Sequence, residues 1–135
     1  MTTTIFFDGS FPQGTKHMHC GLVCGQDARL YHTGSNGRSS GHSEWIAAMI
    51  ALEYAHENRF DDVLLIGDNR NVIGAMSCGW NVDPELLQFK HYADNISAEI
   101  GVVKWDWIST EDNPAGELLR ELREAGKLRY TGIFG

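Results

Sequence analysis

The spacing of apolar residues in the first quarter of the chain predicts three short strands. Thr3–Phe7 is a run of β-branched and aromatic residues that ends at Asp8-Gly9-Ser10. Gly14 lies in the turn region before a second run, His19–Cys24, and Arg29–Thr33 forms the third. The chain therefore begins with strands joined by short connections.

From Glu44 onward the apolar residues recur at helical spacing. Large side chains and alanines alternate so that one face of the helix is bulky and another is small, which indicates close packing on a sheet. The Gly/Ser-rich stretch Gly34–Gly41, before this helix, is expected to be a loop. The large residues are Trp45, Ile46, Met49, Ile50 and Leu52, and the small ones are Ala47, Ala48, Ala51 and Ala55.

A second strand-and-helix unit follows. Val63–Ile66 is a continuous apolar run, typical of a strand covered on both faces, and it ends at Gly67-Asp68. A short helix over residues 71–76 follows. Asp83 is a candidate cap, and Pro84 a candidate first residue, for a helix that reaches about Ile96.

The last elements are a strand and a helix. Val102–Ile108 reads as the final strand. Asn113 as cap and Pro114 at the first helical position predict a helix that Gly126 ends. The predicted order is βββαβααβα, an α/β fold in one domain over residues 1–135.

Composition and charge narrow the class of protein. Hydrophobic residues make up 42% of the chain and charged residues 21%, as is usual for a soluble globular domain. The N-terminal residues fit neither a signal peptide nor a membrane span, so we expect a cytoplasmic protein that does not contact membranes. The three cysteines are expected to be reduced thiols. A net charge of −7 argues against a broad basic nucleic-acid-binding face.

Three carboxylates are candidates for one shared site. Asp8 ends the first strand and Asp68 ends the fourth, and the ends of parallel strands meet at one edge of a sheet. Glu44 opens the helix that covers this sheet, so its side chain can reach the same place. Three converging carboxylates repel one another unless cations neutralise them. Their oxygen ligands suit Mg²⁺ or Mn²⁺, and two such ions about 3.5–4 Å apart support phosphodiester hydrolysis.

Each acid also has a purely structural interpretation. Asp8 precedes Gly9 and could be a turn residue, Glu44 could complement a helix dipole, and Asp68 could cap the next helix. These interpretations stay open for each residue alone. It is the joint placement of the three that favours a metal site.

Several segments together resemble type 1 ribonucleases H, and the resemblance covers nearly the whole chain. It implies a five-stranded mixed sheet whose first three strands are antiparallel, flanked by helices. It also implies hydrolysis of the RNA strand of an RNA–DNA hybrid with Asp8, Glu44 and Asp68 as metal ligands. Glu44 would in addition contact the ribose 2′-hydroxyl. The segments are Asp8-Gly9-Ser10, Ser43-Glu44-Trp45, Asp68–Val72, Trp80, Asn81-Val82-Asp83 and Lys104–Ile108.

The same resemblance implies further site residues. The family's last carboxylate lies four residues after an asparagine, which corresponds here to Glu117 after Asn113, with Asp112 as a substitute. Glu117 could instead be an exposed helix residue partnered by Arg120. Trp80 is either exposed near substrate or packed in the core. Positions implied to contact the hybrid are Ser10, Phe11, Ser40, Gly41 and Arg70.

The chain departs from the family pattern in three places. Ser109–Asp112 contains no histidine where the family usually has a Gly-His pair, and Ser40-Gly41-His42 replaces substrate-gripping asparagines. No basic protrusion lies between Trp80 and Asn81. We therefore expect hybrid binding to be weak or to depend on another region. Two alternatives remain: an inactive domain that binds nucleic acid or protein, and another nuclease such as an exonuclease or resolvase.

Two other groups of residues are candidate sites. His17, His19, Cys20 and Cys24 are close in sequence but match no zinc-binding spacing, so the cysteines are expected to pack as small apolar residues. Trp105 and Trp107 fall on one face of a strand. Core packing is the expected role of both, and a base-stacking platform is the alternative.

Overall fold

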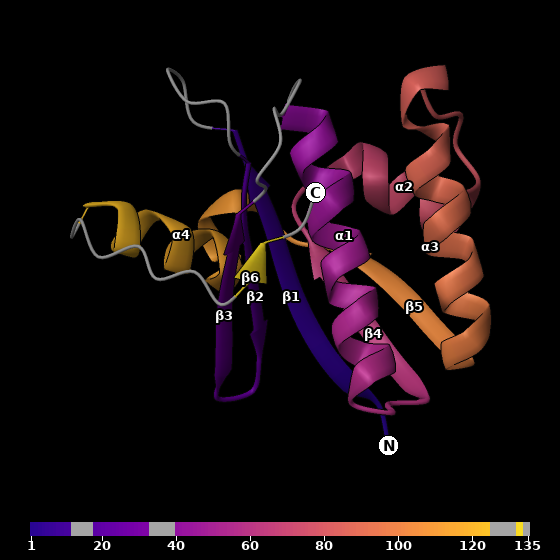
Figure 1. Ribbon diagram of the computed structural model, residues 1–135, viewed down its shortest axis with the longest axis horizontal. Coiled ribbons are helices and arrows are strands. Elements are labelled where there is room, and N and C mark those ends of the chain that lie inside the picture. The colour runs from indigo at the N-terminus through magenta and orange to yellow at the C-terminus, as the bar shows by residue number, and fades with distance from the viewer. Residues whose placement is uncertain (12–17, 33–39, 125–131, 134–135) are drawn as a thin grey trace.

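The computed structural model describes residues 1–11, 18–32, 40–124 and 132–133, and within them a mixed β-sheet forms the centre of the molecule. The spatial order of its strands is β5-β4-β1-β2-β3-β6 (Figure 1). The strands are β1 (Thr3–Ser10), β2 (His19–Cys24), β3 (Asp27–His32), β4 (Asp62–Gly67), β5 (Val102–Trp107) and β6 (Gly132–Ile133).

Strand directions follow the prediction. β1, β2 and β3 pair antiparallel, whereas β4 runs parallel to β1 and β5 runs parallel to β4. The five predicted strands and the mixed sheet are thus confirmed. β6 was not predicted; its two residues pair parallel with β3, and a segment of this length carries no periodic signal.

Helices cover both faces of the sheet. The helices are α1 (Ser40–Glu57), α2 (Arg70–Cys78), α3 (Leu87–Ile100) and α4 (Pro114–Glu124). α1 packs on β1 and β2 and also contacts α3, and α2 packs on β5. α4 packs against β1 and β2 on the other face of the sheet (Figure 1). Along β4, buried Val63 and Leu65 alternate with half-buried Leu64 and Ile66, so the expectation that this strand is covered on both faces is wrong.

Three helix boundaries differ from the sequence expectation. α1 begins at Ser40, so Glu44 lies in its second turn and does not open the helix. Asp83 makes no side-chain cap hydrogen bond; Pro84–Leu86 form a 3₁₀ turn and α3 runs from Leu87 to Ile100. The tighter 3₁₀ turn that begins at Pro84 is therefore separate from α3, which follows it. The predicted stop at Gly126 and most of the Gly34–Gly41 loop lie outside the described residues.

The core lies between α1 and the sheet. Ile5 and Phe7 of β1 are fully buried there, and Ala48, Ala51 and Ala55 of α1 are also inaccessible. A side chain at Gly9 would collide with the backbone carbonyl of Ser43, so this glycine lets the helix backbone approach β1 closely. The small face predicted for the helix thus positions Glu44 directly beside the end of β1.

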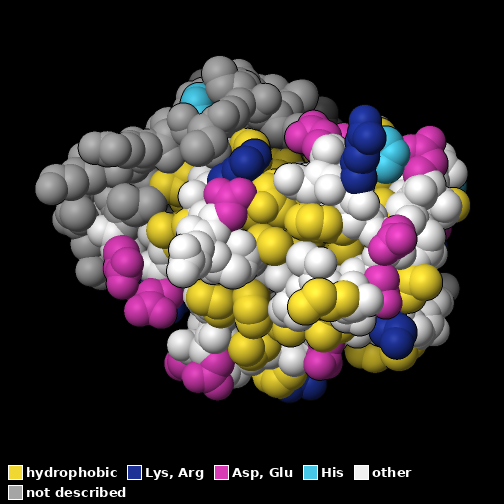
Figure 2. Space-filling model, turned by 90° about the horizontal axis from the view of Figure 1, so that it is seen from below, with side chains coloured by type: hydrophobic (Ala, Val, Ile, Leu, Met, Phe, Trp, Pro, Cys, Tyr) yellow, Lys and Arg dark blue, Asp and Glu magenta, His cyan; other side chains and the backbone are white. Residues whose placement is uncertain are grey.

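At the end of the molecule where β1 begins, the described residues show no concentration of basic side chains. Figure 2 views this end from below, and over its described part yellow hydrophobic side chains are mixed with acidic and a few basic ones. Within the described ranges, no helix is long and apolar enough to cross a membrane.

Candidate metal centre

Asp8, Glu44 and Asp68 come together at the ends of β1 and β4. Asp8 lies on β1 opposite Gly21, Asp68 directly follows β4, and Glu44 reaches the same point from α1. One carboxylate oxygen from each residue lies within 4.8 Å of those of the other two. The parallel pairing of β1 with β4 explains why the two aspartates are neighbours.

Glu44 is the most enclosed of the three. Its side chain is 6% exposed, and the Gly9 N–H donates a hydrogen bond to Oε1 over 3.2 Å. Oε2 is buried and has no hydrogen-bond partner among the described residues. Burial, and then the charge of Asp8, raise the pKa of Glu44 to about 10. A buried oxygen without a donor is costly unless something absent from the polypeptide satisfies it.

The environment of Asp8 opposes ionisation in the same way. Burial raises the pKa of its carboxyl to about 6, and the charge of Asp68 adds to the increase. Bound cations would offset the repulsion between these carboxylates and favour their ionised forms. Carboxylate oxygens are the ligands that Mg²⁺ and Mn²⁺ prefer, so the donor set fits such ions.

Asn113 holds this arrangement from the side of α4. It is fully buried, and its Nδ2 donates to the main-chain oxygen of Phe7 (3.0 Å) and to Oδ2 of Asp68 (3.2 Å). Its Oδ1 accepts a hydrogen bond from the Ala115 N–H (3.1 Å), which caps the helix as predicted. The sequence signal for the cap was Asn113-Pro114. The bonds to Phe7 and Asp68 depend on tertiary placement, and no sequence pattern revealed them.

Glu117 and Asp112 lie outside the carboxylate group. Glu117 is exposed, and its backbone N–H donates to the Asn113 carbonyl. Asp112 is also exposed, and its Oδ2 accepts a hydrogen bond from the Ser109 hydroxyl at 2.8 Å. A pocket of about 270 Å³ opens at the carboxylates. Its lining residues are Asp8, Gly9, Ser10, Glu44, Asp68, Thr110, Gly116, Leu119 and Arg120.

The other proposed contact residues lie in different places around the carboxylates. Ser10 lines the pocket described above, whereas Phe11 is half-buried against the core. Ser40 is the first residue of α1. Trp80 is 52% exposed and packs over Gly74, where any side chain would collide with its indole.

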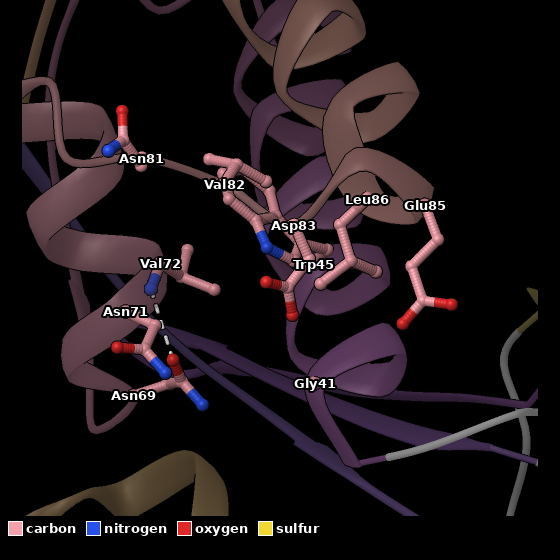
Figure 3. Close-up of a pocket in the computed structure, with 10 residues that line it drawn as sticks. All are labelled: Gly41, Trp45, Asn69, Asn71, Val72, Asn81, Val82, Asp83, Glu85 and Leu86. Carbon is pink, nitrogen blue, oxygen red and sulfur yellow. Dashed lines mark hydrogen bonds between the residues drawn. The ribbon is translucent and has the colours of Figure 1, made fainter.

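A second pocket, of about 420 Å³, includes Trp45 and Asn69, which directly follow Glu44 and Asp68 in the sequence (Figure 3). It is enclosed by the start of α1, the start of α2 and the connection that leads to α3. Glu85 and Asp83 contribute carboxylates, and none of the described residues lining the pocket is a lysine or arginine. The lining residues are Gly41, Trp45, Asn69, Asn71, Val72, Asn81, Val82, Asp83, Glu85 and Leu86.

The two tryptophans of β5 have different environments. Trp105 is half-buried and meets the ring of Phe7 edge-on at a centroid distance of 6.1 Å, as expected for a core residue. The same expectation is wrong for Trp107, which is 39% exposed. Trp107 ends the strand, and the Arg70 guanidinium lies over its ring at 4.1 Å.

The histidine and cysteine residues do not form a second metal centre within the described part of the chain. Cys20 is buried, and its Sγ lies 3.8 Å from the Ser43 carbonyl oxygen, to which the thiol donates. Burial raises the pKa of this thiol well above its usual range. His17 lies outside the described residues, and among those described the carboxylates are the one group that could hold an ion.

Comparison with known proteins decides the family. A family model described as reverse transcriptase-like matches residues 6–119, which is most of the chain. The chain belongs to this family. With the fold described above, it is a ribonuclease H-like domain. No curated protein matches the chain.

Solved ribonuclease H structures share the fold of this domain. RNase H1 from the halophilic archaeon Halobacterium salinarum has a TM-score of 0.79 and 21% identity, covering 93% of this chain and 99% of that one. The N-terminal RNase H domain of rv2228c from Mycobacterium tuberculosis has a TM-score of 0.75 and 16% identity, covering 93% and 98%. LC11-RNase H1, solved in complex with an RNA/DNA hybrid, has a TM-score of 0.77 and 20% identity, covering 91% and 98%.

Proposed function

We propose that this ribonuclease H-like domain is a metal-dependent endonuclease that hydrolyses the RNA strand of RNA–DNA hybrids. The observation that carries the proposal is the convergence of ligand oxygens of Asp8, Glu44 and Asp68 within 4.8 Å, together with a buried oxygen of Glu44 for which the described residues supply no donor. LC11-RNase H1, which shares the fold, was solved with an RNA/DNA hybrid. A hybrid is therefore the first substrate to test.

In this proposal Asp8, Glu44 and Asp68 hold two Mg²⁺ or Mn²⁺ ions, with Glu117 as a fourth ligand. When bound, such ions activate water and stabilise the leaving oxygen of a phosphodiester. The Gly9 N–H fixes one oxygen of Glu44, and the other has no hydrogen-bond partner among the described residues. Asn113 similarly fixes one oxygen of Asp68. These two bonds restrict how the carboxylates can turn before an ion arrives.

The nucleic acid would bind across the two pockets. Arg70, two residues after Asp68, is exposed and offers donors to a phosphate. Trp80 exposes an aromatic face for a base or sugar. The remaining proposed contacts are Ser10, Phe11, Ser40 and Gly41.

A second candidate function is a ribonuclease H-like domain that binds nucleic acid or protein with little or no turnover. Among the described residues that line the larger pocket, two are carboxylates and none is a lysine or arginine, so these side chains would repel a phosphate backbone. The connection at Ser109–Asp112 also lacks a histidine that could move a proton. Both features favour slow cleavage.

Cleavage and metal binding separate these candidates. We expect the purified chain to cut the RNA strand of a labelled hybrid in Mn²⁺, and Asp68→Asn to lower the rate by a factor of at least about 100. Glu117→Gln should lower Mn²⁺ affinity in calorimetry more than Asp112→Asn does. Single-stranded and branched substrates, tested in parallel, identify an exonuclease or resolvase. Full activity of Asp68→Asn would reject the proposed mechanism, and Mn²⁺ binding without cleavage would favour the second candidate.

A further inference from the structure

The indole of Trp107 contacts the backbone of one proposed metal ligand, Asp68, and also the guanidinium of Arg70. Its Nε1–H donates a hydrogen bond to the main-chain carbonyl of Asp68, with an N–O distance of 3.0 Å. The guanidinium carbon of Arg70 lies 4.1 Å from the centre of its ring. One side chain therefore links the carboxylate cluster to Arg70.

The backbone beneath this indole is held in place by strand pairing. Trp107 is in register with Gly67 of β4, and the next residue, Ile108, donates its N–H to the Gly67 carbonyl at 3.0 Å. The indole is nevertheless 39% exposed, so burial in the core does not account for its orientation. The orientation of the indole is explained by its hydrogen bond to the Asp68 carbonyl and its contact with the Arg70 guanidinium.

Arg70 occupies a position that does not favour a cation. It is the first residue of α2, where the helix dipole repels positive charge, and the first turn of α2 contains no acidic residue. In the described part of the chain, no carboxylate forms an ion pair with it. The face of the Trp107 ring holds the guanidinium instead. A guanidinium held over an aromatic ring can still offer the N–H groups along its edge to a phosphate.

We propose that Trp107 is a positioning residue, whose ring face aims Arg70 at a phosphate of the bound nucleic acid and whose N–H fixes the backbone of Asp68. The inference deepens the proposed function and rests on it. The two contacts use different parts of one side chain, the ring face and the N–H, so substitutions can separate them.

The experiment measures two binding reactions for each variant. Mn²⁺ affinity is measured by calorimetry. Affinity for a fluorescent RNA–DNA hybrid is measured by anisotropy at several salt concentrations, with every variant also carrying Asp8→Asn so that nothing is cut. The matched control is Trp105→Phe, on the same strand, because Trp105 contacts neither Asp68 nor Arg70 in the structure. Thermal melting verifies that each variant is folded.

The variants should give three different patterns. Trp107→Phe keeps an aromatic face but lacks the N–H, so Mn²⁺ affinity should fall about tenfold while hybrid affinity changes little. Arg70→Gln should leave Mn²⁺ affinity intact, weaken hybrid binding and reduce the salt slope by about 1. Trp107→Leu should show both losses. Should Trp107→Leu fail to fold, Arg70→Lys provides the second test, because an ammonium lacks the planar stack and should bind the hybrid almost as weakly as Arg70→Gln.

Each half of the inference can fail on its own. If Trp107→Phe has the same Mn²⁺ affinity as Trp105→Phe, the indole N–H does not position Asp68. If folded Trp107→Leu, or Arg70→Lys in its place, binds hybrid as tightly as the Trp105→Phe control, the ring does not position Arg70. An otherwise wild-type chain that binds no Mn²⁺, and whose Asp8→Asn form binds no hybrid, would overturn the proposed function itself. Normal wild-type binding with unchanged variants would overturn this inference alone.

Discussion

Glu44 shows at the scale of one residue how a binding site can oppose stability. Its carboxyl is buried, one oxygen has only the Gly9 N–H as a donor, and the other has no partner in the described structure. The ordinary pKa of 4.5 rises to about 10, chiefly because of burial. Ionising this group in the metal-free protein is therefore unfavourable.

Replacing Glu44 by glutamine should stabilise the metal-free protein at alkaline pH. Because the folded-state pKa is raised, the contribution of Glu44 to stability is greatest below pH 4.5 and is lost as the pH rises toward 10. In EDTA at pH 8, Glu44→Gln should increase the free energy of unfolding by on the order of 2 kcal/mol, with little effect at pH 4. Melting followed by circular dichroism measures this difference.

The control for that prediction is Glu111→Gln, which removes an equal charge from an exposed residue. It should leave the melting curve nearly unchanged at both pH values. Added Mn²⁺ should stabilise the wild type and not Glu44→Gln. Identical melting of Glu44→Gln and Glu111→Gln in EDTA would show that the buried carboxyl has no cost.

At the scale of elements, two helix N-termini meet at the carboxylates, and an asparagine caps each one. Asn69 Oδ1 accepts a hydrogen bond from the Val72 N–H at 3.0 Å and caps α2. Asn113 caps α4 and also reaches Phe7 and Asp68. The two caps are chemically equal, but only Asn113 is bonded to a proposed metal ligand.

The two caps provide a matched pair of substitutions. Asn69→Ala should cost about 1 kcal/mol of stability, the usual value of a lost cap. Asn113→Ala should cost about 2–4 kcal/mol, because it also leaves the buried Phe7 carbonyl without its side-chain donor. Urea unfolding measures both values. Mn²⁺ affinity should fall only in Asn113→Ala, and equal affinity in the two variants would show that Asn113 serves α4 alone.

Several elements were predictable because their signals are local. The apolar run of β4, the small face of α1 and the Asn-Pro start of α4 each specify an element without reference to the rest of the chain. The start of α1 at Ser40 was missed, since Ser40–Ser43 lacks large apolar residues at helical spacing. β6 was missed because two residues carry no period.

The candidate site was predictable to a different degree. The proximity of Asp8 and Asp68 could be predicted because both follow or end neighbouring parallel strands. The proximity of Glu44 could be predicted because it belongs to the helix that covers those strands. The exposure of Trp107 could not be foreseen, because alternation along a strand specifies a face and does not say where a covering helix ends. Its contact with Arg70 depends on the placement of α2 over β5, which is a tertiary property.

At the scale of the whole molecule, charge opposes the proposed substrate. The net charge of −7 repels a polyanion at long range, and Asp83 and Glu85 bring the same repulsion to the larger pocket. Figure 3 shows both carboxylates among the side chains drawn at this pocket. Binding must therefore rely on metal ions and on local cations such as Arg70.

Neutralising the pocket should strengthen binding of the hybrid. The double variant Asp83→Asn/Glu85→Gln is expected to lower the dissociation constant about threefold to tenfold at low salt, and less at high salt, because screening weakens the repulsion. Glu57→Gln/Asp61→Asn is the matched control. It removes the same charge at the opposite end of the sheet, where β4 begins. If both double variants bind equally, total charge matters and the pocket does not.

The Gly9 amide has a consequence for spectroscopy. This backbone proton belongs to the central strand, yet its acceptor is a side chain of the carboxylate cluster. Its resonance in an NMR spectrum would report on ion binding from within the sheet, and its rate of exchange with deuterium would reveal whether the cluster opens without the core. This one amide would thus distinguish a site that opens locally from one that opens only when the whole domain unfolds.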